Sequence, residues 1–236
     1  MAADLPAPTG RTSPPLNRAA VVHAAVAFAD REGLAAVSMR RLSAELGVVP
    51  MALYKHVTDK DDLVAAMIDA IVAGYAAPPP GLEWREGVRQ RVLAARDALL
   101  QHPWLRTAIE SATQRTPAVL GHMDAVAGEF AAGGLSYDLV HHAMHALGHR
   151  IWGFSPEAFS SPPAQESAPS SAPSADEQAA MVAAMAFRFP HIAAIAADSA
   201  SRHVTGACDE QFEFEFTLDL LLEAVARLHA AQWSSS

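Results

Sequence analysis

Apolar residues recur at helical spacing along most of the chain. Val22, Val26 and Ala29 are separated by four and then three positions, which places them on one face of a helix. Asn17 precedes this segment and can cap a helix, and Gly33 follows it and suits a helix end. The pattern therefore predicts a first helix between Asn17 and Gly33.

Two short helical segments follow at close spacing. Ser38 can cap the first, which carries Leu42 and Leu46, and Gly47 comes directly after it. Pro50 then stands where the first turn of a helix tolerates proline. The tight turn requires glycine, because a Cβ would be strained in a left-handed backbone conformation. This is the spacing of a helix-turn-helix, whose second helix enters the major groove of DNA.

A fourth helix is predicted after this motif. Thr58 can cap it, and Asp61 three positions later provides a weak capping box. Its apolar face is expected to be buried and consists of Leu63, Met67 and Ile71. The run Pro78-Pro79-Pro80-Gly81 ends the segment.

The rest of the chain is predicted to form further helices. Up to residue 153 the helical pattern is interrupted by proline or paired glycine at His102-Pro103, Thr116-Pro117 and Gly133-Gly134. Ser136 can cap a helix that runs to about Gly153. Residues 155–175 are rich in Ser, Pro and Ala and have no apolar period, so we expect a long mobile loop.

Two helical segments are predicted beyond this loop. The first begins at about Asp176 and is interrupted at Phe189-Pro190. The last begins near Asp209, and its apolar positions repeat every four residues at Phe212, Phe216, Leu220, Ala224 and Leu228. The sequence thus predicts an all-α protein.

Composition and segment lengths refine this prediction. The 236 residues are 51% hydrophobic and 18% charged, which is typical of a folded chain. We expect a loose tail at 1–15, a three-helix head at 16–77 and a larger helical domain at 82–232. A single cysteine excludes an intramolecular disulfide framework. Neither a signal peptide nor an apolar run near the roughly 20 residues of a membrane span is visible, so a cytoplasmic location is expected.

The segment SMRRLSAELGVVPMALYKHVTDK, from Ser38 to Lys60, resembles the DNA-binding domain of the TetR (tetracycline-repressor) family. The pattern Gly47-Val48 followed by LYKHV and Lys60 is its most specific part. The segments GGLSYDLVHHAMHALGHRIWGF and FEFEFTLDLLLEAV are similar to the C-terminal helical domain of the tetracycline-repressor branch. The resemblance extends from Leu16 to Leu228 and implies a ligand-responsive regulator of transcription, usually a repressor.

The resemblance also implies how the head would contact DNA. The recognition helix would span about Val49 to His56, with Arg40 as the best candidate for a guanine contact. The predicted DNA-binding residues are Arg40, Arg41, Pro50, Met51, Ala52, Tyr54, Lys55, His56 and Lys60. Between Leu16 and Lys60 there are six Lys or Arg residues and four acids, whereas the whole chain has a formal net charge of −9. The alternative is that these cations form an ordinary solvated face.

One helix-turn-helix reads only a few base pairs, so we expect a homodimer on a palindromic operator. The last helix is the predicted dimer element, because its apolar face is long for a surface helix. The resemblance favours a four-helix bundle with two helices from each subunit. The alternative is that this face is buried within one subunit.

Residues 82–210 show no function from spacing alone, but the resemblance implies a pocket for a small-molecule effector. The candidate pocket residues are Trp104, Glu110, Met123, Val126, His141, Met144, His145, Trp152 and Glu157. Methionine and aromatic residues at helical spacing are more often plain core. Tetracycline itself is disfavoured, because Ala76, Arg91 and Ala95 replace the residues that grip the drug in the branch.

Metal binding has two candidate sources. His141, His145 and His149 share one helical face beside His142, and an i, i+4 histidine pair can chelate a divalent cation. These histidines can equally be ordinary polar helix residues. The resemblance adds Glu110 and Glu157 as oxygen ligands for Mg²⁺ carried by a chelating effector, although solvated surface acids are the commoner case.

A metal-dependent helical enzyme or metal sensor that uses the His141–His149 run is the competing function. The absence of His-Glu-x-x-His, of a Gly-x-Ser-x-Gly elbow and of a Gly-rich phosphate loop argues against an enzyme. A helical interaction protein without DNA binding is a third reading. The expected partners are double-stranded operator DNA, a small-molecule effector and a second copy of the chain, with no membrane.

Overall fold

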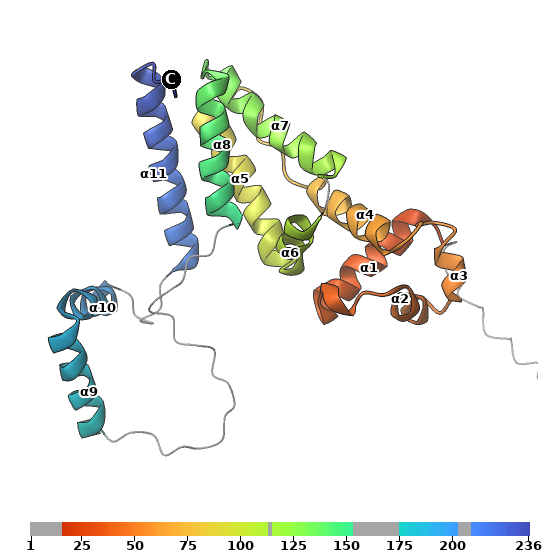
Figure 1. Cartoon of the computed structure of the whole chain (residues 1–236), viewed down its shortest axis with the longest axis horizontal. Helices are drawn as coiled ribbons and strands as arrows, with labels where there is room; N and C mark the ends of the chain where they lie inside the picture. The colour runs from red at the N-terminus through yellow and green to blue at the C-terminus, as the bar shows by residue number, and fades with distance from the viewer. Residues whose placement is uncertain (1–15, 113–114, 153–174, 203–208) are drawn as a thin grey trace, which may run out of the picture. The chain divides into compact units, whose positions relative to one another are not determined.

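The computed structural model describes residues 16–112, 115–152, 175–202 and 209–236, and every regular element in these ranges is helical (Figure 1). The predicted all-α fold is therefore confirmed for the described part of the chain. The chain divides into two units. The first contains the described residues up to Met144 together with Ser234–Ser236, and the second extends from His145 to Trp233.

The first unit begins with a head of short helices. These are α1 (Arg18–Glu32), the 3₁₀ turn η1 (Leu34–Ala36), α2 (Met39–Glu45), α3 (Pro50–Leu53) and α4 (Lys60–Val72). The caps predicted for α1 and α2 are confirmed, since Asn17 accepts the Ala20 N–H at 2.8 Å and Ser38 accepts the Arg41 N–H at 3.3 Å. Gly47 has φ of 66°, the left-handed conformation predicted for the turn.

Three boundaries in the head differ from prediction. Asp59, not Thr58, caps α4, and its Oδ1 accepts the Asp62 N–H at 2.8 Å. The acid that reaches back is Asp62, not Asp61: its Oδ2 accepts the Thr58 N–H at 2.8 Å. Aspartate and threonine are both good caps, so the sequence did not separate two adjacent candidates. Helix α3 ends at Leu53 with a turn over 54–56, and α4 ends at Val72, ahead of the proline run.

The body of the first unit consists of α5 (Trp84–Gln101), α6 (Trp104–Ser111), α7 (Pro117–Ala132) and the first half of α8 (Tyr137–Trp152). The predicted interruptions coincide with helix boundaries: Pro103 and Gly133 lie between helices, and Pro117 is the first residue of α7. Helix α5 packs along α7, and α4 contacts both α6 and α7, which joins the head to the body. The buried side chains here include Val88, Val92, Ala95, Leu105, Ala108, Phe130 and Leu139.

The second unit contains the rest of α8, α9 (Ala175–Arg188), α10 (Pro190–Arg202) and α11 (Glu210–Ala230). The break before α10 and the start of α11 at the Asp209 cap are as predicted. In α11 the side chains of Phe214, Leu218, Leu222 and Val225 are buried. The apolar residues predicted to form a stripe are not on this buried face. Phe212, Phe216, Leu220 and Leu228 are exposed.

No helix in the described ranges is both long enough and apolar enough to cross a membrane.

Candidate DNA interface and ligand cavity

The helix-turn-helix presents an exposed apolar edge. Leu42 of α2 and Leu53 of α3 are fully buried and hold the two helices together. On the outer side Val49 and Met51 are 68% and 70% exposed, and Tyr54 is also exposed. Val49 was not among the predicted contacts, although its place directly before Pro50 at the helix start could have indicated it. The side chains of Val49 and Met51 can pack against apolar groups but cannot form hydrogen bonds.

Three cations of the head are bound to acids within the head. Arg31 bonds Glu45 at 2.5 Å, which joins α1 to α2. Arg41 bonds Glu32 at 3.1 Å and lies over the Phe28 ring, with its guanidinium carbon 5.0 Å from the ring centroid. The third is Arg18. These pairs stabilise the head and reduce the positive charge available to a phosphate.

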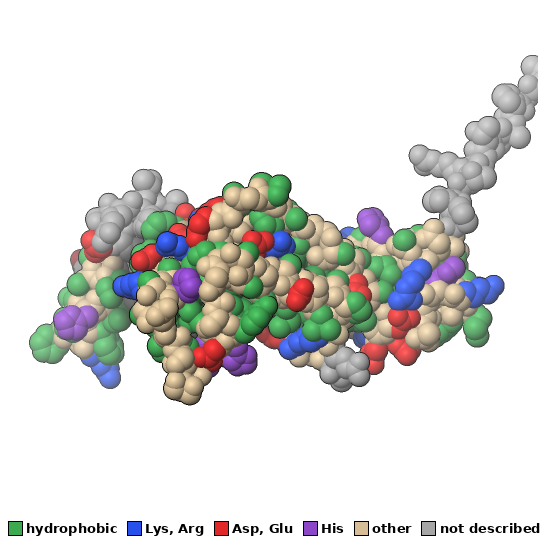
Figure 2. Space-filling model, turned by 90° about the horizontal axis from the view of Figure 1, so that it is seen from above, with side chains coloured by type: hydrophobic (Ala, Val, Ile, Leu, Met, Phe, Trp, Pro, Cys, Tyr) green, Lys and Arg blue, Asp and Glu red, His purple; other side chains and the backbone are tan. Residues whose placement is uncertain are grey.

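Three other cations have no such partner. Arg40, Lys55 and Lys60 are exposed, and no hydrogen bond or ion pair joins their side chains to another residue within the described ranges. Figure 2 shows the basic side chains of the head interleaved with acidic ones rather than forming a continuous patch. These three are therefore the head cations that no acid neutralises within the described ranges.

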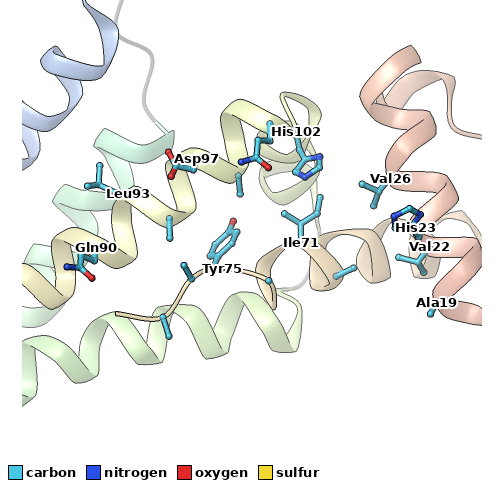
Figure 3. Close-up of a pocket in the computed structure, with 17 residues that line it drawn as sticks. Ala19, Val22, His23, Val26, Ile71, Tyr75, Gln90, Leu93, Asp97 and His102 are labelled. Carbon is cyan, nitrogen blue, oxygen red and sulfur yellow. The ribbon is translucent and has the colours of Figure 1, made fainter. Parts of the chain in front are cut away.

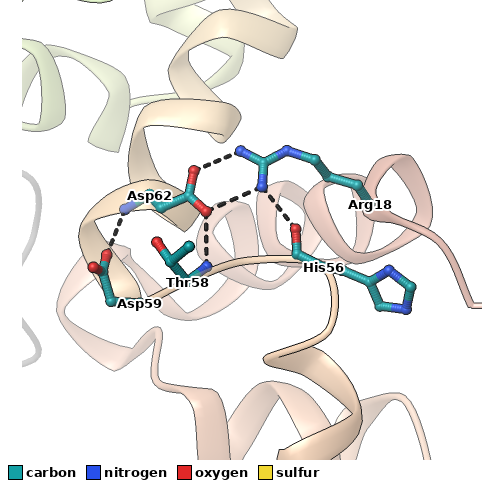
Figure 4. A network of polar contacts seen from close by, with 5 residues as sticks. All are labelled: Arg18, His56, Thr58, Asp59 and Asp62. Carbon is teal, nitrogen blue, oxygen red and sulfur yellow. Dashed lines mark hydrogen bonds and ion pairs between the residues drawn. The ribbon is translucent and has the colours of Figure 1, made fainter.

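Arg18 connects the end of the recognition segment to the start of α4 (Figure 4). Its guanidinium donates to the His56 carbonyl at 2.7 Å and to both carboxylate oxygens of Asp62, at 2.6 and 3.0 Å. The hydrogen bonds from Arg18 and from the Thr58 N–H lower the pKa of Asp62 to about 2. Local sequence patterns do not indicate this network, because Arg18 and Asp62 are 44 positions apart.

The predicted effector-pocket residues lie partly in the core and partly on the surface. Trp104 and Val126 are buried, and Met144 is half-buried. The exposed members are Glu110, Met123, His141 and His145. The Trp152 side chain and Glu157 lie outside the described residues.

A polar group lies in the body near the positions that grip the drug in the tetracycline-repressor branch. Arg91 of α5 donates to Glu129 of α7 at 2.8 Å, and both side chains are about one-fifth exposed. The His122 ring meets the Tyr75 ring edge-on, with 5.0 Å between centroids. Burial, and secondarily the Arg91 charge, lowers the pKa of His122, and burial raises the pKa of Tyr75 to about 12. At neutral pH the Tyr75 hydroxyl therefore keeps its proton.

A cavity of about 930 Å³ lies between α1, the end of α4 and α5 (Figure 3). Val22, His23 and Val26 border it from α1, Ile71 and Tyr75 from α4 and the residues after it, and α5 completes the wall. All of these residues belong to the first unit. None of the predicted pocket residues lines this cavity, so sequence analysis missed it.

A magnesium site cannot be assembled from the described residues. The Glu110 carboxylate is bonded to Arg106 at 3.0 Å on the helix surface, and Glu157 is outside the described ranges. Within those ranges, no group of three or more His, Cys, Asp or Glu side chains is placed to hold a metal ion.

Two family models match the chain. Residues 21–67 match "Bacterial regulatory proteins, tetR family", and residues 77–228 match "Tetracyclin repressor-like, C-terminal domain".

Similar proteins are described as transcriptional regulators. An HTH-type transcriptional regulator of Saccharopolyspora erythraea is 32% identical over 130 residues, covering 55% of this chain and 55% of that protein. An HTH-type transcriptional repressor of Streptomyces coeruleorubidus is 33% identical over 121 residues, or 50% of this chain and 45% of that one. The match thus spans about half the length of each relative. The solved structure of ActR from Streptomyces coelicolor in complex with (S)-DNPA has the same fold, with a TM-score of 0.65 at 23% identity over 92% of this chain and 100% of that one.

Proposed function

The chain belongs to the tetR family of bacterial regulatory proteins, and on that premise we propose that it is a homodimeric, ligand-responsive repressor that binds operator DNA. The observation that carries the proposal is the helix-turn-helix, whose exposed edge lies beside three cations that pair with no acid in the described part of the chain. Relatives described as transcriptional regulators support the same function. A regulator of this kind would act in the cytoplasm.

Base reading would be performed by α3 and the start of α2. Met51 and Ala52 would pack against thymine methyl groups beside Pro50, and Arg40 would donate a bidentate pair to guanine. Phosphates would be held by Tyr54, Lys55, His56 and Lys60, and by the amide end of α4. The ion pair of Arg41 with Glu32 competes with phosphate, so we assign Arg41 a smaller share of the affinity than Arg40.

Dimerisation would use α11. Phe212, Phe216 and Leu220 leave a row of large apolar side chains exposed, and the first two rings stack with centroids 6.2 Å apart. A second copy of the same helix can cover such a row, and a two-fold axis makes the interface self-complementary. Two heads related by this axis would read two halves of a palindrome.

Ligand response would pass through α4, because this helix contacts the head at one end and the body at the other. Asp62 near its start bonds Arg18, and Asp69 accepts the Ala118 N–H at the start of α7 at 3.1 Å. An effector that favours one body arrangement would thereby change the placement of α3. The coupling is reciprocal, so operator DNA must weaken effector binding by the same factor.

The effector pocket predicted from the resemblance remains part of this proposal. The predicted pocket residues within the described ranges do not identify one effector. The ion pair of Arg91 with Glu129 supports an effector other than tetracycline. His141 and His145 would act as polar pocket residues in this function rather than as metal ligands.

A selection experiment tests the proposal without knowledge of the operator. The dimeric protein is incubated with a random duplex library, and the enriched sequences are aligned. We expect a palindrome whose half-sites lie about 10 base pairs apart or a multiple of that. Affinity for the enriched duplex should fall steeply with salt, and Arg40→Ala should lower the preference over a scrambled duplex. Failure to enrich any sequence at low salt would contradict the proposed function.

A further inference from the structure

Helix α5 is buried on one side and borders a cavity on the other. Val88, Val92 and Ala95 are buried. Leu93, Asp97 and Gln101 lie about half a turn away from them and line the cavity of Figure 3. The cavity extends to Tyr75, whose ring meets His122 of α7, so it adjoins the packing of α5 on α7.

The wall of the cavity is mostly apolar. Val22 and Val26 of α1 face Ile71 of α4 and Leu93 of α5 across it. Six alanines also line the wall, at positions 19, 70, 76, 77, 94 and 98, and their short side chains leave the space open. A volume of about 930 Å³ lies in the range of pockets that hold drug-sized molecules.

The formal charge of the cavity wall is negative. Asp97 is the one carboxylate among the lining residues, and no Lys or Arg is among them. Asp97 is exposed, and no hydrogen bond or ion pair joins its carboxylate to another residue within the described ranges. An anion in this cavity would meet a negative charge without a balancing cation, whereas a cation would find a partner.

The other titratable groups facing the cavity are His23, Tyr75 and His102. His102 is bonded through Nδ1 to Asp30 at 2.8 Å. Tyr75 keeps its hydroxyl proton at neutral pH and can donate to or accept from a bound molecule. These groups add polar contacts without adding a negative charge.

We propose that this cavity is a binding site for an amphipathic, cationic small molecule, whose apolar body lies between Val22, Ile71 and Leu93 and whose positive group pairs with Asp97. Its walls come from the head through α1 and α4 and from the body through α5. A ligand held between them resists any change in the angle of the head to the body. The regulatory part of this inference, that occupancy changes operator affinity, rests on the proposed function.

A matched pair of dyes tests the site directly. Rhodamine 6G and fluorescein share a flat apolar ring system, but the first is a cation and the second an anion at pH 7.5. We expect rhodamine 6G to bind the full-length protein saturably by fluorescence anisotropy and fluorescein not to bind. Asp97→Asn should weaken rhodamine 6G by about three- to fivefold, since one partly solvated ion pair is lost. Ala94→Trp should fill the cavity and weaken it by about tenfold or more.

Asp124→Asn is the control, because it removes the same charge from an exposed α7 position that is not part of the cavity wall. It should change rhodamine 6G affinity by less than about twofold. Thermal melting followed by circular dichroism checks that Ala94→Trp folds. If it does not fold, Asp97→Asn still tests the site. Absence of rhodamine 6G binding, equal binding of fluorescein, or unchanged affinity in both cavity variants would overturn the site.

Operator affinity then separates the two proposals. If the protein binds its selected duplex, rhodamine 6G should lower that affinity in the wild type, and Asp97→Asn should need about three- to fivefold more dye for the same effect. Dye that acted by binding the DNA itself would affect both proteins at the same concentration. A protein that binds the dye through Asp97 but no duplex would contradict the proposed function and leave the site intact. A duplex-binding protein whose affinity is the same with and without dye would overturn the regulatory part.

Discussion

Trp104 donates its indole N–H to Asp30 Oδ1 at 2.6 Å, although the two residues are 74 positions apart. The same oxygen lies 2.8 Å from His102 Nδ1. Asp30 belongs to α1 in the head, and the two aromatic residues flank Pro103 at the corner between α5 and α6. One carboxylate of the head is therefore bound twice by the body, next to the cavity wall.

Loss of the Asp30 carboxylate should loosen this junction. Asp30→Ala leaves the N–H of the buried Trp104 without its acceptor, which should cost about 1–3 kcal/mol in the free energy of unfolding. Urea denaturation followed by circular dichroism measures the change. Asp124→Ala, at an exposed position, should stay within about 0.5 kcal/mol of wild type. Equal midpoints for the two variants would show that the junction contributes no stability.

The ion pair of Arg18 with Asp62 predicts a pH dependence of stability. The pKa of Asp62 is lowered from 3.8 to about 2 in the folded protein, so its stabilisation is present above pH 4 and is lost as the pH falls toward 2. Arg18 is about half exposed, so solvent screening limits the contribution to about 1 kcal/mol or less.

Asp62→Asn isolates this contribution. The variant should be less stable than wild type at pH 6, and the gap in unfolding free energy should narrow steadily between pH 4 and pH 2.5. Urea titrations of both proteins at several pH values provide the measurement. A gap that stays constant with pH would mean that the carboxylate charge is not what stabilises the head.

Local signals predicted the helices well, because each cap or break involves residues a few positions apart. Asn17, Ser38, Ser136 and Asp209 all stand where the sequence placed the helix starts. The Thr58 assignment was wrong by one residue, because the adjacent Asp59 is an equally suitable cap. These helix boundaries depend on the chemistry of neighbouring side chains, which can be read from the sequence.

The contacts that shape the site could not be predicted in the same way. The partners of Arg18 and Arg41 depend on how α1 packs against α2 and α4, so sequence could not separate paired from unpaired cations in the head. The cavity depends on small residues of α1, α4 and α5 meeting across space. The apolar period of a single helix does not indicate which residues of other helices it will contact.

Close packing of α5 on α7 predicts an unequal response of two glycines to alanine. A Cβ added to Gly87 would lie 2.5 Å from Glu129 Oε2, the carboxylate that pairs with Arg91. Gly87→Ala must move that carboxylate away from Arg91, and the loss of this ion pair, about 1 kcal/mol, should offset the helix propensity that alanine adds. Gly121→Ala in α7 meets nothing within 4 Å and should stabilise by about 0.5–1 kcal/mol. A larger rise in the thermal midpoint for Gly121→Ala than for Gly87→Ala would support this account, and equal rises would contradict it.

The distribution of ion pairs in the head predicts which cations set the salt dependence of DNA binding. Lys55→Ala and Lys60→Ala should each reduce the slope of log affinity against log salt by about 1, because each lysine displaces one counterion from a phosphate. Arg41→Ala should change the slope by much less, since Arg41 is bound to Glu32 in the free protein. Fluorescence anisotropy with the selected duplex between 50 and 200 mM salt measures all three. If only Arg41→Ala reduced the slope by a full unit, Arg41 and not the two lysines would be the phosphate contact.

The exposed row of α11 predicts that one substitution separates dimerisation from folding. Phe216 is 51% exposed and stacks on Phe212, so Phe216→Asp leaves the buried side of the helix intact. If the row is covered by a second copy, a desolvated carboxylate there opposes association strongly, and sedimentation equilibrium should give the monomer mass of 25.0 kDa. Affinity for a palindromic duplex should fall by at least about tenfold, while a single half-site should be bound as before.

Leu120→Asp is the matched control, since Leu120 is similarly exposed (53%) on α7. It should remain a dimer and keep its affinity for the palindrome. A dimeric Phe216→Asp protein would remove α11 from the interface. A monomeric protein that still binds the palindrome at full affinity would contradict the proposal that operator binding requires a dimer, because one head cannot occupy both half-sites.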